Sequence, residues 1–144
     1  MRFWHLGVVV GLAICGCGRS PTIPKIETLP VKGTVTLDGK PLAGAIVIFM
    51  TVDTPAAYVG TTKEDGTYEL QGPEGRAASL KGHCQVTVSR MVKPDGSPLA
   101  PGELPAIVGA VEQLSPKYAS LEATTLSANV DATGGTFDFP LTAN

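Results

Sequence analysis

The chain has few of the side chains from which chemical sites are usually built. Its 144 residues include two histidines, three cysteines and one tryptophan. Charged residues make up only 17% of the chain, and 13 acidic residues outnumber 11 basic ones. Nucleic-acid binding needs an excess of basic residues, so the composition predicts no nucleic-acid partner. The sequence also lacks a glycine-rich loop of the kind that cradles phosphates between a strand and a helix, which argues against a nucleotide ligand.

The few candidate catalytic and metal-binding residues are poorly placed. Beyond residue 17, His83 and Cys84 are the sole histidine and cysteine, too few ligands for zinc. They are neighbours on a predicted strand, so their side chains point to opposite faces and cannot form a catalytic pair. Cys84 shares its face with apolar residues and is expected to be buried and unreactive. Several acidic residues sit in predicted turns, where their side chains bond to the local backbone: Asp38, Asp65 and Asp95. We therefore expect no enzyme, no metal and no cofactor, although two carboxylates suffice for glycoside hydrolysis and a hydrolase stays an alternative.

The N-terminal segment has the pattern of an export signal. Arg2 precedes an apolar run of nine residues at 6–14. A membrane-spanning helix needs about 20 residues, so the run is too short to span, but it suits the hydrophobic core of a secretory signal. The tetrapeptide Ile-Cys-Gly-Cys at 14–17 resembles the lipobox of bacterial lipoprotein signals. The resemblance implies a signal peptide over 1–16, cleavage before Cys17, and acylation of Cys17 with fatty acids such as palmitate.

A proline-rich tether is predicted after this cysteine. Residues 18–30 contain three prolines and no apolar periodicity, which is typical of an extended linker. The lipidated Cys17 and the tether, together 17–30, would hold a folded domain over 31–144 clear of a membrane surface. The sequence thus predicts an exported protein that is lipid-anchored to a cell-envelope membrane and faces the periplasm or the outside.

The remaining sequence alternates with the period of β-strands. The chain has 17 glycines and 12 prolines, which leave little room for long helices. About seven short strands are predicted, over residues 31–37, 45–52, 58–63, 67–70, 83–91, 124–130 and 136–141. This number is typical of an all-β, Ig-like sandwich. The sequence Asp-Gly-Lys-Pro at 38–41 predicts a turn, in which we expect the proline to prevent ladder pairing.

The predicted strand at 45–52 is apolar on both faces. One set of alternate residues is expected to fill the core. The other set points outward and consists of Ile46, Ile48 and Met50. A sheet face in contact with water would not ordinarily carry three such apolar side chains. The candidate cover within the chain is the segment 99–121, through its apolar residues Leu104, Ile107, Val108, Val111 and Leu114. We expect this segment to act as a lid that covers the three outward residues. If it does not cover them, the three residues become a candidate interface for a partner protein.

A series of positions between residues 31 and 89 has the order and spacing of a known family. The matching residues are Gly33, Val35, Asp38, Gly39, Lys40, Pro41, Leu42, Gly44, Ala45, Val47, Thr62, Asp65, Gly66, Tyr68, Leu70, Gly82, Val86, Thr87 and Val88. Together they resemble the carboxypeptidase regulatory-like domain, a transthyretin-related β-sandwich found beside peptidases and in secreted bacterial proteins. Residues 114–118 and 137–139 resemble the tail of small bacterial lipoproteins built on this one domain. The resemblance implies a transthyretin-like fold in an exported setting, and it implies no reaction.

These features predict a membrane-anchored, exported, non-enzymatic lipoprotein that acts as a binding or structural module of the cell envelope. The expected partners are the membrane, through Cys17, and an envelope protein or a glycan. A carbohydrate-binding module is the alternative function. Such a module would need exposed aromatic residues. Tyr58 and Tyr118 are the two tyrosines that are not expected to lie in the core.

Overall fold

The computed structural model describes residues 30–53, 55–72, 80–131 and 133–143. The predicted signal peptide 1–16, Cys17 and the predicted tether up to residue 29 lie outside the described residues. The structure has 46% strand and 8% helix, which confirms the all-β sandwich predicted from the sequence. The strands are β1 (Val31–Leu37), β2 (Lys40–Pro41), β3 (Ile46–Thr51), β4 (Ala57–Thr61), β5 (Thr67–Glu69), β6 (Gly82–Ser89), β7 (Met91–Val92), β8 (Val111–Glu112), β9 (Ser127–Val130), β10 (Gly135–Thr136) and β11 (Phe139–Leu141). The helices are α1 (Pro105–Val108) and α2 (Pro116–Ala119), each about one turn long.

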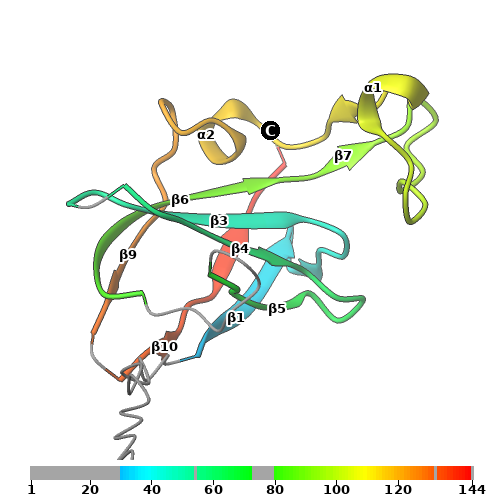
Figure 1. Cartoon of the computed structure of the whole chain (residues 1–144). Helices are drawn as coiled ribbons and strands as arrows, with labels where there is room; N and C mark the ends of the chain where they lie inside the picture. The colour runs from blue at the N-terminus through cyan, green and yellow to red at the C-terminus, as the bar shows by residue number, and fades with distance from the viewer. Residues whose placement is uncertain (1–29, 54, 73–79, 132, 144) are drawn as a thin grey trace, which may run out of the picture.

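Two sheets face each other across the core (Figure 1). The first is antiparallel throughout, in the order β4-β3-β6-β9. The second is built around β1, which pairs with β5 and β2 antiparallel and with β10 and β11 parallel. Strands β7 and β8 form a separate two-stranded ladder. In β1 and β3, apolar residues recur at every second position, so the apolar side of each strand faces the space between the sheets.

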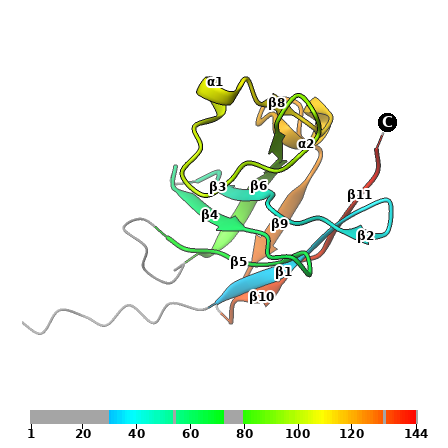
Figure 2. The same ribbon diagram turned by 90° about the vertical axis from the view of Figure 1, so that its right-hand side faces the viewer.

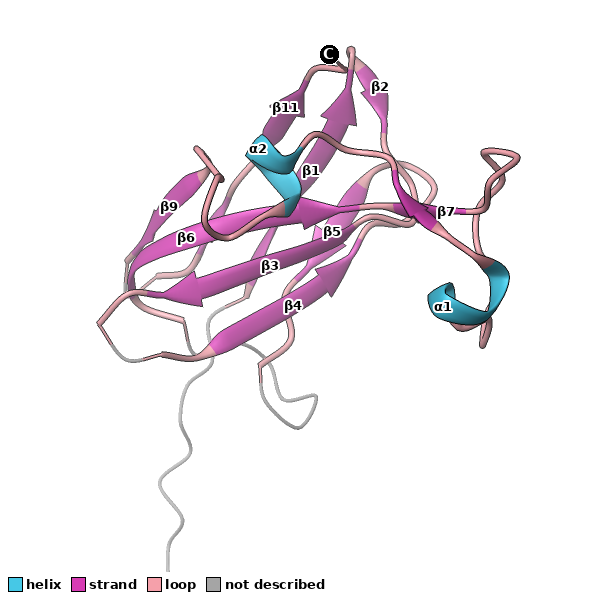
Figure 3. Ribbon diagram, turned by 90° about the horizontal axis from the view of Figure 1, so that it is seen from above, coloured by secondary structure: helices cyan, strands magenta, loops and turns pink. Residues whose placement is uncertain are grey.

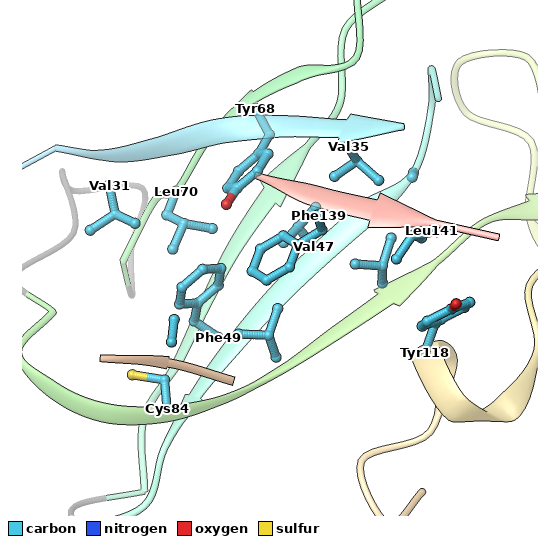
Figure 4. Packing of buried hydrophobic residues seen from close by; sticks show 14 of the residues in the cluster. Val31, Val35, Val47, Phe49, Tyr68, Leu70, Cys84, Tyr118, Phe139 and Leu141 are labelled. Carbon is cyan, nitrogen blue, oxygen red and sulfur yellow. The ribbon is translucent and has the colours of Figure 1, made fainter. Parts of the chain in front are cut away.

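The core is centred on Phe49 of β3 (Figure 4). Its ring centroid lies 5.9 Å from that of Phe137, 6.0 Å from that of Phe139 and 6.4 Å from that of Tyr68. Such aromatic pairs contribute about 0.5–1.5 kcal/mol each beyond the burial of their surface. The hydroxyl of Tyr68 donates to the carbonyl oxygen of Phe137 at 2.7 Å, so its one polar atom is satisfied. Burial raises the pKa of Tyr68 above its ordinary value. The two sheets are therefore joined by one aromatic cluster.

The two open sides of the sandwich are closed in different ways. Along one side, Val59 of β4 and Gln71 exchange two backbone hydrogen bonds of 3.0 and 2.9 Å. On the other, α2 packs against β6 and buries Tyr118 in the core beside Leu141 (Figure 4). The phenol oxygen of Tyr118 lies 3.2 Å from Oγ1 of Thr142 and accepts from the backbone N–H of Thr142 at 3.3 Å. A short helix thus closes the side that β9 is too short to cover.

The predicted turn at 38–41 is a tight hairpin, but its proline is paired. Residues 38 and 39 have φ of 49° and 78°, the left-handed pair that a two-residue hairpin turn requires. Pro41 pairs with Thr36, so the expectation that it prevents pairing is wrong. The backbone N–H of Leu42 donates to the carbonyl of Val35 at 3.0 Å. Pro41 therefore occupies a position whose nitrogen points away from β1, where no N–H is needed.

The last two predicted strands are shorter than expected or divided. The predicted strand at 124–130 begins only at Ser127, and the Thr124 hydroxyl donates instead to the carbonyl of Val86 at 2.6 Å. The predicted strand at 136–141 is split into β10 and β11. At the split, a carboxylate oxygen of Asp138 accepts the backbone N–H of Thr34 at 2.8 Å. A side-chain donor therefore replaces a backbone N–H at the first break, and a side-chain acceptor replaces a backbone carbonyl at the second.

Residues 90–113, here named the arm, leave the sandwich as a hairpin (Figure 2). The carboxylate of Glu112 fixes its base by accepting from Ser89 Oγ at 2.5 Å and from the backbone N–H groups of Arg90 and Leu114 at 2.9 Å each. The Nε of Arg90 donates to the carbonyl of Ala43 at 2.8 Å. These bonds attach the base of the arm to the sandwich, and the rest of the arm projects away from it.

Candidate binding face

The candidate site is the outward side of strands β3 and β4. Its register pairs Ile46 with Thr61, Ile48 with Val59, and Met50 with Ala57. We name the four larger apolar residues the outer face: Ile46, Ile48, Met50 and Val59. Val47 and Phe49, which point inward from β3, are fully buried, whereas Ile46 is 40% and Val59 41% exposed and Ile48 and Met50 are half-buried. The prediction that Ile46, Ile48 and Met50 point away from the core is therefore confirmed in direction.

The predicted lid does not cover this face. In the arm, Leu104 is 60%, Ile107 78% and Val111 51% exposed, and Val108 is half-buried, so most of the predicted lid residues remain at the surface. Leu114 is buried, but it belongs to the main core together with Tyr118. The expectation of an intrachain lid is wrong: the arm is held at its base by the bonds of Glu112 and Arg90 and extends past the ends of β3 and β4 instead of lying over them (Figure 3).

The chemistry of the outer face is apolar and uncharged. No outward residue of β3 or β4 is charged: they are Ile46, Ile48, Met50, Ala57, Val59 and Thr61. On the neighbouring strand β6, Thr87 lies opposite Ile48 and Gln85 opposite Met50. Such a surface can bind through burial of apolar area, and it offers nothing that would hold an ion or a charged substrate.

A groove of about 620 Å³ borders the outer face along the side where β4 meets β5. Val59 of the outer face lines it, together with Ala57, Thr61, Lys63 and Glu69. The sequence did not predict this groove, because it forms between residues 57–63 and 69–72, which the bridge between Val59 and Gln71 brings together.

His83 and Cys84 lie on opposite faces of β6, as predicted. His83 is exposed, and Cys84 is fully buried and free. The thiol of Cys84 lies 3.6 Å from the carbonyl oxygen of Gly82, to which it donates. Burial raises the pKa of the Cys84 thiol, which reduces the fraction present as the nucleophilic thiolate. The two residues do not form a catalytic pair.

The acidic turn residues have structural roles. Asp65 accepts the backbone N–H and the hydroxyl of the residue two positions later, at 3.0 and 2.6 Å. Asp95 and Asp131 make the same pair of bonds, and in all three turns these bonds lower the pKa of the aspartate. Asp38 departs from the prediction, because it accepts the distant backbone N–H of Ala143 at 3.1 Å instead of a local one. Within the described ranges, histidine, cysteine and acidic residues form no cluster of three or more that would hold a metal.

The tyrosines expected to be free are not exposed. Tyr118 is buried in the core, and Tyr58 is half-buried and packs against the same cluster. The exposed aromatic residues that the alternative of a carbohydrate-binding module would need are therefore not supplied by Tyr118 or fully by Tyr58. Every aromatic side chain in the part of the chain that the structure describes is buried or half-buried.

Among the described residues, neither helix is long and apolar enough to cross a membrane. Comparisons with known protein families, with curated proteins and with solved structures find no match to this chain.

Proposed function

We propose that this chain is an exported, lipid-anchored, non-enzymatic lipoprotein with one carboxypeptidase regulatory-like domain, and that it acts as a binding module of the cell envelope. The observation that carries the proposal is the outer face, of which Ile46 and Val59 are exposed and Ile48 and Met50 half-buried. Its four apolar side chains lie together on a sheet whose solvated side would ordinarily be polar. The partner we propose is a protein of the envelope with an apolar, uncharged docking surface.

Burial of the outer face supplies a useful but moderate affinity. Full burial of a branched aliphatic side chain stabilises a complex by roughly 1.5–3 kcal/mol. About two-fifths of Ile46 and of Val59 is still exposed, so covering each would contribute about 1 kcal/mol, or roughly fivefold in Kd. An anchor on the same membrane as the partner would raise the local concentration and make such an affinity sufficient.

The arrangement of the domain suits an anchor at its N-terminal side. The start of β1 lies at one end of the sandwich, whereas α1 and the C-terminus lie at the other (Figure 1). A lipid on Cys17, with the tether after it, would reach the domain at the first of these ends. The outer face runs along the side of the sandwich and would stay accessible to a partner in the envelope.

The binding part of the proposal is tested by making the outer face polar. Ile46→Thr, Ile48→Thr and Val59→Thr keep β-branched residues in the strands while removing apolar surface. The matched control makes the same change at three exposed residues of the arm: Leu104→Thr, Ile107→Thr and Val111→Thr. The intact lipidated proteins are purified from membranes, and their bound proteins are compared. The proposal expects one partner to be lost with the first variant and kept with the control; loss with the control alone would place the binding surface on the arm.

The anchoring part is tested separately by Cys17→Ser and phase separation in detergent. We expect the variant to leave the detergent phase, whereas Cys15→Ser should behave as the wild type because small residues suit that position. A Cys17→Ser protein that stays in the detergent phase would contradict the lipid anchor without bearing on the outer face.

A further inference from the structure

Strand β9 is an edge strand with an unpaired row of backbone groups (Figure 3). The N–H of Val86 donates to the carbonyl of Leu126, and the ladder continues with Cys84 opposite Ala128. In an antiparallel ladder only alternate residues bond to a given neighbour. The N–H and C=O groups of Ser127 and Asn129 therefore point away from β6, and they have no hydrogen bond with any described residue.

The other long edges of the sandwich are protected. The edge of β4 is closed by its two hydrogen bonds between Val59 and Gln71. Strand β11 carries Pro140 at its centre, which has no N–H to offer a new strand. Strand β9 has neither device, and its exposed side chains, those of Ser127 and Asn129, are small and uncharged. Natural sheets usually protect an exposed edge with a charge, a proline or a cover.

We propose that β9 is a homodimer interface, in which a second copy of this chain adds its own β9 antiparallel to the first. The free backbone groups lie at two positions separated by one residue, so a two-fold axis through Ala128 makes the edge self-complementary. Ser127 of each copy would then face Asn129 of the other, and the two pairs would exchange four N–H···O=C hydrogen bonds. At the next position Thr125 would face Asp131, so no like charges meet across the axis.

The dimer itself does not depend on the proposed function, but its consequence for binding rests on it. The pairing joins the two four-stranded sheets into one continuous sheet of eight strands. A two-fold axis perpendicular to this sheet leaves both outer faces on the same side. A partner with two docking surfaces would then meet two equivalent sites on one dimer.

Mixed cysteine variants test the register directly. The full chain is prepared with Cys15→Ser and Cys17→Ser, while the buried Cys84 is kept. One preparation also carries Ser127→Cys and another Asn129→Cys. We expect an oxidised disulfide dimer when the two are mixed, because the paired Cα atoms would lie about 5.5 Å apart. Neither variant alone should cross-link, since identical positions would lie about 8 Å apart. No cross-linking in the mixture, or equal cross-linking by one variant alone, would overturn the proposal.

Sedimentation of the full chain in detergent gives the second test. We expect a concentration-dependent dimer, and we expect Ser127→Lys with Asn129→Lys to raise its Kd at least tenfold by placing like charges across the axis. Ala57→Lys with Thr61→Lys adds the same charge at exposed positions of β4, at the opposite edge of the sheet, and should leave the dimer unchanged. A monomeric wild type, or an equal effect of both pairs, would overturn the interface. If the first lysine variant fails to fold, the cysteine mixture decides alone.

Discussion

Gly33 in β1 is the position at which one added methyl group should most damage the fold. An ideal Cβ on Gly33 would lie 1.7 Å from the carbonyl oxygen of Phe137, 2.6 Å from its carbonyl carbon and 3.0 Å from Cε1 of Tyr68. The two nearest atoms are backbone, so no rotamer change relieves the overlap. Gly33→Ala must therefore push β1 away from the segment around Phe137.

The structure gives the size of this effect. The segment is held to its neighbours by the hydrogen bonds from Phe137 N–H to the Lys32 carbonyl, from Tyr68 to the Phe137 carbonyl, and from Thr34 N–H to Asp138, at 2.8, 2.7 and 2.8 Å. Three such bonds are worth about 3 kcal/mol net, and overpacking adds about 1–3 kcal/mol. We expect Gly33→Ala to lower the free energy of unfolding by about 4–6 kcal/mol, a large part of the about 5–15 kcal/mol that stabilises a typical domain.

Urea unfolding followed by circular dichroism measures this difference. The control is Gly96→Ala, because Gly96 has a φ of 82° and nothing lies within 4 Å of its added Cβ. That control carries only the cost of a left-handed alanine, about 1–2 kcal/mol. If Gly33→Ala costs no more than Gly96→Ala, the close approach of Phe137 to β1 is refuted.

Two further predictions concern the buried thiol and the acidic turns. In a chain with Cys84 as its sole cysteine, a thiol reagent should label the protein slowly under native conditions and fully in denaturant; fast native labelling would place Cys84 at the surface. Hydrogen bonds lower the pKa of Asp65, Asp95 and Asp131 in the folded state. The stability that these three carboxylates contribute is therefore present above the ordinary aspartate pKa of 3.8, and it is lost as the pH falls below that value. Asn at all three positions keeps the turn acceptor but cannot titrate, so the urea midpoint of that variant should fall less than that of the wild type between about pH 5 and pH 2.5; parallel profiles would contradict this assignment.

The sequence predicted the features that depend on local alternation. The period of two in β1 and β3 correctly separated the buried Val47 and Phe49 from the outward Ile46 and Ile48. It also placed His83 and Cys84 on opposite faces of β6. These successes have one cause, since a strand exposes alternate residues to alternate faces whatever lies around it.

The sequence could not predict features that depend on contacts between distant residues. The arm is held at its base by the bond from Arg90 to the carbonyl of Ala43, 47 residues away. Asp38 bonds to Ala143 across 105 residues, although its neighbours suggest a purely local turn. Tyr118 is buried because a one-turn helix closes the open side of the sandwich, and no period in so short a helix signals that burial.

Photo-crosslinking in the native envelope tests most directly whether the outer face binds a partner. A photoreactive residue replaces Val59 on the outer face in one strain and Ile107 on the arm in another; both positions are exposed and aliphatic. The intact, lipid-anchored protein is irradiated in cells, and the membrane fraction is analysed for cross-linked species. The account predicts one discrete protein adduct from position 59 and none from position 107. The absence of an adduct at position 59, or the same adducts at both positions, would contradict it.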